Sequence, residues 1–165
     1  MQRLLLVAPA HRLRQLPALG PLHFQSKLGI AHQAVRALKF SHQAQALALE
    51  IGNQNILAGS LFVIAFVHAV TGKLDEATHG LEEALRVSRV AGEKGREGFN
   101  LTLLGQLYNW QGEYEQGLQL LEQGFTIGHA QDLQLIVLHI LWHRGLAHSG
   151  KGEYAAALAA LHDAL

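Results

Sequence analysis

One short motif recurs three times along the chain at a spacing of 40 residues. It reads GKLDEA from Gly72, GEYEQG from Gly112 and GEYAAA from Gly152. Further positions repeat in the same register, among them Leu61, Leu101 and Leu141, and Leu81, Leu121 and Leu161. A period in this range is typical of stacked supersecondary units, because a single unit is too small to bury its own apolar face. The repeat therefore predicts one domain in which neighbouring units pack side by side.

Within each repeat the apolar residues are three or four positions apart, as at Leu101, Leu104 and Leu107. This is the spacing of an α-helix. Each motif glycine stands where one helix is expected to end, and the acidic residues after it favour the start of the next helix. The pattern predicts helices at about 31–51, 55–71, 74–91, 97–110, 114–128, 132–149 and 153–165.

Small residues also follow the period, and they have a packing role in this interpretation. Alanine or glycine stands at 65, 105 and 145, and again at 77, 117 and 157. We expect these positions to let two helix backbones approach closely while larger leucine and tyrosine side chains fill the space beside them.

The helical units define a repeat domain over residues 31–165, with a partial unit at 31–51 and full units at 55–91, 97–128 and 132–165. The partial unit is a weaker copy in which Ala37, Ala44 and Gly52 stand 40 residues before Ala77, Ala84 and Gly92. Residues 1–30 carry all three prolines and do not follow the pattern. They are expected to form an irregular leader or a degenerate first helix.

The large and small residues resemble those of the tetratricopeptide repeat. The positions that carry the resemblance are Leu101, Leu104, Gly105, Tyr108, Gly112, Tyr114, Gly117, Leu121 and Gly124. The resemblance implies an all-α fold: an α-solenoid, a right-handed superhelix of antiparallel helix pairs, acting as a protein-interaction module. The period departs from the usual length of about 34 residues. The longer form resembles the arrays of bacterial signalling ATPases, class III nucleotide cyclase fusions and large transcriptional activators.

Charge and composition narrow the classes of partner. Thirteen basic side chains balance thirteen acidic ones, so the chain lacks the excess of cations on which nucleic-acid binding depends. There is no cysteine, which excludes disulfides, thiolate nucleophiles and cysteine-based metal sites. Only 16% of residues are charged, against about 25% in ordinary soluble domains. We therefore expect a surface that is partly covered by a partner or by the rest of a larger protein.

Neither export nor membrane insertion is predicted. The N-terminal apolar run in MQRLLLVAPA is short for a signal peptide. The most apolar stretch, residues 56–70, is shorter than the roughly 18 to 20 residues that cross a bilayer, and it contains Ser60 and His68. A cytoplasmic protein with no membrane contact is expected.

No set of residues points to catalysis or to a cofactor. His139 and His143 are four residues apart, a spacing that can place two imidazoles on one helix face for a metal. No glutamate lies between them and no third ligand is evident, so packing within a repeat helix is the favoured interpretation. The glycine-rich segment at residues 92–98 lacks the phosphate-loop pattern and is interpreted as a turn. The chain is expected to be non-catalytic and to hold no metal or cofactor.

The resemblance also implies a binding surface, since the first helix of each pair lines the concave face of such an array. The inward positions are Phe62, Phe66, Phe99, Thr102, Gln106, Asn109, Trp110, His139, Trp142 and Leu146. Aromatic rings with a few amides suit an extended or helical peptide. The family's carboxylate clamp is not reproduced, because Val63 and Leu103 stand where asparagines would be. Alternatively, these side chains pack against further repeats or another domain.

The last helix lacks a partner for its far side, where Leu158, Leu161 and Leu165 are expected to be uncovered. Repeat arrays usually end in a polar cap. This suggests a fragment, a truncated reading frame, or a chain that self-associates or needs a partner at this end. Two functional hypotheses remain open: a module that binds a peptide or partner domain, and the regulatory or sensor region of a larger signalling ATPase, cyclase or transcriptional regulator. A histidine-based metal or enzymatic site is the disfavoured third.

Overall fold

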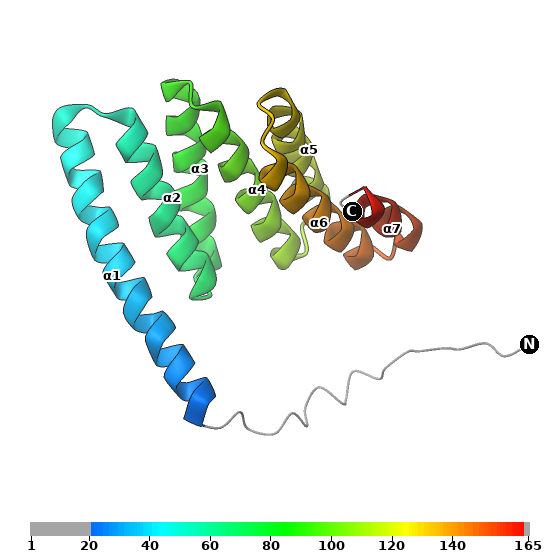
Figure 1. Cartoon of the computed structure of the whole chain (residues 1–165), viewed down its shortest axis with the longest axis horizontal. Helices are drawn as coiled ribbons and strands as arrows, with labels where there is room; N and C mark the ends of the chain where they lie inside the picture. The colour runs from blue at the N-terminus through cyan, green and yellow to red at the C-terminus, as the bar shows by residue number, and fades with distance from the viewer. Residues whose placement is uncertain (1–20, 164–165) are drawn as a thin grey trace, which may run out of the picture. The chain divides into compact units, whose positions relative to one another are not determined.

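The computed structural model describes residues 21–163, with side chains from residue 33 onward. This part of the chain forms seven α-helices and no strand, which confirms the all-α prediction (Figure 1). The helices are α1 (Pro21–Ile51), α2 (Gln54–Val70), α3 (Leu74–Ala91), α4 (Lys94–Gln111), α5 (Tyr114–Ala130), α6 (Gln134–Gly150) and α7 (Tyr154–His162). The chain divides into two compact units, Met1–Arg36 and Ala37–Leu165, and helices α2 to α7 all lie in the second.

The first helix is longer than the sequence pattern indicated. It begins at Pro21, so residues 21–30 are helical and do not belong to an irregular leader. Proline is well suited to the first turn of a helix, because its missing N–H has no partner there in any case. Residues 1–20 of the expected leader lie outside the described residues.

The chain turns every 20 residues, twice in each 40-residue repeat. A positive φ angle marks each turn, at Gly52, Gly72, Gly92, Gly112, Asp132 and Gly152. The residue after each of these donates its backbone N–H to the carbonyl five positions earlier, as from Glu93 to Ser88 at 3.0 Å. This bond closes the end of a helix around a left-handed residue. Among the described turns, only the one at Asp132 has a residue other than glycine at the position with positive φ.

Consecutive helices pack as pairs, α2 with α3, α4 with α5 and α6 with α7, and α4 also packs against α2 and α6. The small residues act as predicted. A Cβ atom added at Gly105 would lie 2.9 Å from the carbonyl oxygen of Gly117, and one added at Gly145 would lie 2.7 Å from Cγ of Leu161. Around these contacts the largest fully buried aliphatic side chains include Leu81, Leu101, Leu107, Leu121 and Ile140.

The end of the described chain corrects part of one expectation. Leu161 is not uncovered, because it packs into the space that Gly145 leaves on α6. Tyr154 and Leu158 are each 69% exposed, as expected for the far face of α7. The equivalent Tyr114 on α5 is partly buried, because its ring lies against Gly150 at the end of α6. Leu165 lies outside the described residues.

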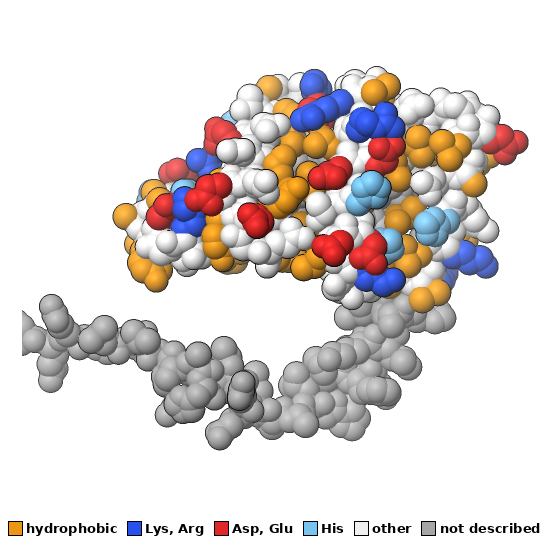
Figure 2. Space-filling model, turned by 180° about the vertical axis from the view of Figure 1, so that it is seen from behind, with side chains coloured by type: hydrophobic (Ala, Val, Ile, Leu, Met, Phe, Trp, Pro, Cys, Tyr) orange, Lys and Arg blue, Asp and Glu red, His pale blue; other side chains and the backbone are white. Residues whose placement is uncertain are grey.

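Among the described helices, none combines the length and the apolar character that crossing a bilayer requires. Basic and acidic side chains are interspersed on the face shown in Figure 2, with hydrophobic side chains exposed between them. This face carries no large patch of one charge, in keeping with the balanced composition.

Candidate protein-binding groove

Three adjoining hollows form a groove along one side of α2 and α4. The first, which we call the aromatic hollow, has a volume of about 410 Å³ and is lined by Phe62, Phe66, Ala69, Val70, Phe99, Thr102, Leu103, Gln106, Trp110 and His139. The second shares Phe62 and Phe99 with it and adds Glu93, Gly95 and Arg96. The third shares Arg96 and extends over Phe40, Ser41, Ala44, Asn55, Ile56, Gly59, Ser60 and Val63. Because each hollow shares residues with the next, they make one continuous surface.

Helical periodicity brings these side chains onto one face. Phe62 and Phe66 are one turn apart on α2, and Phe99, Gln106 and Trp110 follow at helical intervals along α4. The rings of Phe62 and Phe66 are stacked, with centroids 6.3 Å apart, and Phe62 meets Phe99 edge-on at 6.4 Å. Such arrangements are favourable for aromatic pairs and hold the rings in place.

The aromatic rings remain open to solvent. The exposed fractions of Phe66, Phe99 and Trp110 are 45%, 51% and 52%. Each is large enough to cover substantial apolar area on a partner. Gln106 is partly buried between them and offers an amide group beside the rings. The aromatic hollow therefore has a floor of rings with limited hydrogen-bonding capacity.

Seven of the ten predicted residues line the aromatic hollow: Phe62, Phe66, Phe99, Thr102, Gln106, Trp110 and His139. Thr102 is buried beneath it, and its hydroxyl donates to the Gly98 carbonyl at 2.8 Å. Trp142 and Leu146 are exposed on α6 but do not line any of the three hollows.

The prediction for Asn109 is wrong. This side chain is buried, and its Nδ2 donates to the backbone carbonyl of His143 at 3.2 Å. Its Oδ1 lies directly against Gly117 on α5. Asn109 therefore connects α4 to α5 and α6 and is not offered to a partner in the groove. The space that admits it exists because position 117 has no side chain.

Arg96 is the main groove residue that sequence reasoning missed. The glycine-rich segment at residues 92–98 was interpreted as a turn, whereas α4 begins at Lys94 and includes Arg96 in its first turn. The spacing of Arg96, Phe99, Leu103 and Gln106 is helical and continues the groove face of α4 backward. That periodicity is the signal that identifies Arg96.

Two ion pairs to the buried Glu97 fix the start of α4. Glu97 is buried and accepts from Lys94 Nζ at 2.7 Å and from Arg89 Nε at 2.9 Å. Burial alone would raise the pKa of Glu97, but the hydrogen bonds from these two cations hold it below its ordinary value. Nearby, Asn100 Nδ2 donates to Ser88 Oγ at 3.0 Å within the core. These bonds tie α4 to α3 and so position Arg96 and Phe99.

The two α6 histidines form a pair beside the groove. Their Nε2 atoms are 3.1 Å apart, so one ring donates to the other. Burial, and then the neighbouring His139, lower the pKa of His143 to about 4, and burial also lowers the pKa of His139. Both rings are therefore neutral at pH 7. Among the described residues, no group of three histidine, cysteine, aspartate or glutamate side chains is placed to hold a metal.

The chain matches no family model, and none of the curated proteins compared with it is similar in sequence. The likeness to the tetratricopeptide repeat thus stays a prediction.

Proposed function

We propose that the chain is a non-catalytic, tetratricopeptide-like solenoid whose groove on α2 and α4 binds an extended or helical segment of another protein. The observation that carries this proposal is the continuous groove with the half-exposed rings of Phe66, Phe99 and Trp110. Three helix pairs in contact through small residues, with turns every 20 residues, support the repeat assignment.

The physical basis of binding is burial of aromatic area on a fixed surface. The rings are held by their neighbours and by regular helices, so little conformational entropy is lost when a partner covers them. Aromatic residues at the centre of an interface commonly provide most of its binding energy. The amide of Gln106, between the rings, is placed to pair with a backbone group of the bound segment.

A second candidate function is a regulatory region within a larger signalling protein, in which the solenoid packs on another domain. The specific observation that favours it is the 69% exposure of Tyr154 and Leu158 on α7. At the equivalent place on α5, Tyr114 is covered by the end of α6, the first helix of the following pair. An apolar helix face of this kind suits contact with a neighbouring domain.

The test of the proposed function uses the chain's two tryptophans as a matched pair. Twelve-residue peptides are selected from a random display library on the wild-type chain. Their affinities are then measured for the Trp110→Ala, Phe99→Ala and Trp142→Ala variants, with circular dichroism to confirm folding. We expect roughly 10-fold or greater weakening for the two groove variants. Trp142→Ala is the control, because Trp142 is equally exposed but lies outside the three hollows.

Fluorescence gives a direct reading of where the peptide binds. In a Trp142→Phe variant, Trp110 is the only remaining tryptophan, so a change in its emission reports occupation of the groove. Selected peptides that leave this emission unchanged and bind the Trp110→Ala variant normally would place the binding surface elsewhere and refute the proposal.

A further inference from the structure

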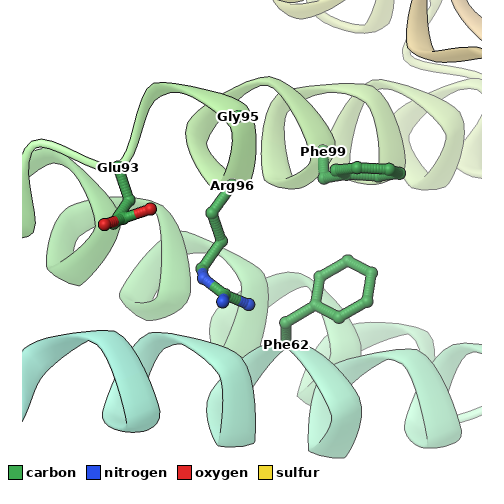
Figure 3. A pocket seen from close by; sticks show the side chains of 5 residues that line it. All are labelled: Phe62, Glu93, Gly95, Arg96 and Phe99. Atoms are coloured by element: carbon green, nitrogen blue, oxygen red, sulfur yellow. The ribbon is translucent and has the colours of Figure 1, made fainter. Parts of the chain in front are cut away.

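Arg96 projects from the first turn of α4 toward α2, at the junction of two of the hollows. Figure 3 shows its side chain extending toward Phe62, with Phe99 farther along the same helix and Glu93 on the other side. The adjoining hollow places Asn55, Ile56 and Val63 near the same arginine. The guanidinium thus lies within an apolar groove, not on an open charged surface.

The donors of Arg96 are not used within the described part of the chain. Five other cations there, Arg86, Arg89, Lys94, Arg144 and Lys151, form ion pairs with glutamates, and Arg96 forms none. Its Nε is buried and has no hydrogen-bond partner. Buried donors are nearly always satisfied in folded proteins. A guanidinium that lies beside Phe62 and Phe99 and forms no ion pair within the described residues is arranged to receive an acceptor from a bound segment.

We propose that Arg96 anchors a carboxylate side chain of the bound peptide, so that the groove takes acidic segments with bulky apolar residues beside the acid. This inference rests on the proposed function and specifies the chemistry of its partner. A carboxylate matches the planar fork of a guanidinium, and exclusion of water by the surrounding rings strengthens the contact. The anchor is separate from the family's clamp, whose asparagine positions hold Val63 and Leu103.

The charge of the site favours a carboxylate over a phosphate. The hollow around Arg96 contains one cation and one carboxylate, that of Glu93. A phosphoryl group carries nearly two negative charges at neutral pH and is usually bound by several cations or backbone donors. Because Glu93 repels every added negative charge, a phosphoryl group is disfavoured more than a carboxylate, which adds one charge to face the one guanidinium.

The length of the groove sets the length of the segment. Arg96 and Trp110 are 14 positions apart on α4, which at 1.5 Å per residue is about 21 Å. An extended peptide covers this distance with about six or seven residues. The bound segment therefore carries its acidic residue at one end and its bulky apolar residues over Phe62, Phe99 and Trp110.

The experiment selects peptides in parallel on three forms of the full chain: wild type, Arg96→Gln and the control Lys73→Gln. Lys73 is an exposed cation in the turn between α2 and α3, so its substitution removes the same charge outside the groove. We expect wild type and Lys73→Gln to enrich aspartate or glutamate at one end of a cluster of bulky apolar residues that extends over about six positions. We expect Arg96→Gln to retain the apolar cluster and lose the acid.

Synthetic peptides then separate the sources of negative charge. A selected peptide is compared in forms with glutamate, glutamine or phosphoserine at the acidic position. Replacing glutamate by glutamine should weaken binding to wild type by roughly 10- to 100-fold and leave binding to Arg96→Gln nearly unchanged. Phosphoserine should bind more weakly than glutamate, and a phosphopeptide that binds more tightly would overturn the choice of carboxylate.

Failure of this inference is distinguishable from failure of the proposed function. Identical apolar motifs without acidic residues on wild type and Arg96→Gln would reject the anchor and leave the groove as a peptide site. If no selected peptide alters the fluorescence of Trp110, the peptide-binding function itself is rejected.

Discussion

Mild acid should destabilise the fold through one buried imidazole, that of His143. The ring is only 5% exposed, and its Nε2 meets Nε2 of His139 at 3.1 Å. Burial is the main reason that the pKa of His143 falls to about 4, and proximity to His139 adds to the effect. A proton on this ring would place a charge between α6 and the rest of the core.

The sign of this pH effect follows from comparing the pKa of His143 in the unfolded and the folded chain. The unfolded chain binds a proton at His143 near pH 6.5, whereas the folded chain does so only near pH 4. Above pH 6.5 both states are neutral and the full stability is present. As the pH falls from 6.5 to 4, the unfolded state binds more protons, so the free energy of unfolding decreases. The difference of 6.5 − 4 in pKa corresponds to about 3 kcal/mol at 1.36 kcal/mol per pKa unit.

The measurement is urea unfolding followed by circular dichroism at several pH values between 7.5 and 4. The comparison is among wild type, His143→Phe and the control His162→Gln, whose histidine is exposed on α7. Wild type and the control should lose stability together, whereas His143→Phe should lose less over the same range. His139 adds a smaller dependence of the same sign, because its pKa is also lowered. An NMR titration of His143 near pH 6.5, or equal pH dependence in all three chains, would refute this reasoning.

Three further predictions concern helix packing, a turn and self-association. Gly105→Ala should lower the free energy of unfolding by about 1–2 kcal/mol, measured by urea titration, because overpacking against the Gly117 carbonyl at 2.9 Å outweighs the gain in helix propensity. Asp132→Gly should raise it by about 0.5–1 kcal/mol, since a φ of 53° is strained for aspartate; an unchanged urea midpoint would contradict this. We expect the chain to self-associate through the exposed Tyr154 and Leu158 of α7. The sedimentation mass of the wild-type chain should rise with concentration, and changing both residues to serine should reduce that rise. A wild-type chain that stays monomeric at all concentrations would reject the prediction.

The sequence predicted the turns and the close helix contacts well, because both depend on single residues with few alternatives. Glycine at a left-handed turn position and glycine opposite a neighbouring backbone each answer a local steric requirement. Asp132 shows where the turn rule fails, since the chain adopts the same geometry there without glycine. The repeat period, not the residue type, identifies that turn.

The start of α4 could not be predicted from local propensity. Gly95 and Gly98 both disfavour a helix, so the segment has the composition of a loop. In the fold, a Cβ at Gly98 would be 3.4 Å from Ile127, so the backbone lies close to α5. The ion pairs of Glu97 add a second tertiary contact. Packing and buried charge therefore outweigh the weak propensity of this segment.

The error at Asn109 has a different origin. Neighbouring positions on a helix differ by about 100° in direction, so Asn109 and Trp110 face different surroundings although both were assigned to the groove. Trp110 faces solvent, whereas Asn109 enters the gap at Gly117 and reaches the His143 carbonyl. The sequence period predicts which helix face a residue lies on only to within one position. Contacts with the neighbouring helices decide which of two adjacent residues faces the groove.

The start of α4 also determines the candidate site. Arg96 and Phe99 reach the groove only because residues from Lys94 onward are helical, and that helical turn is maintained by the buried Glu97 with Lys94 and Arg89. A segment in which Gly95 and Gly98 disfavour a helix is thus the one that positions the proposed anchor. A segment with strong intrinsic helix propensity would not need the ion pairs of the buried Glu97 to be helical. It would also lack the glycines that let α4 lie close to α5. The features that concealed Arg96 in the sequence are the same ones that place it in the groove beside Phe62 and Phe99.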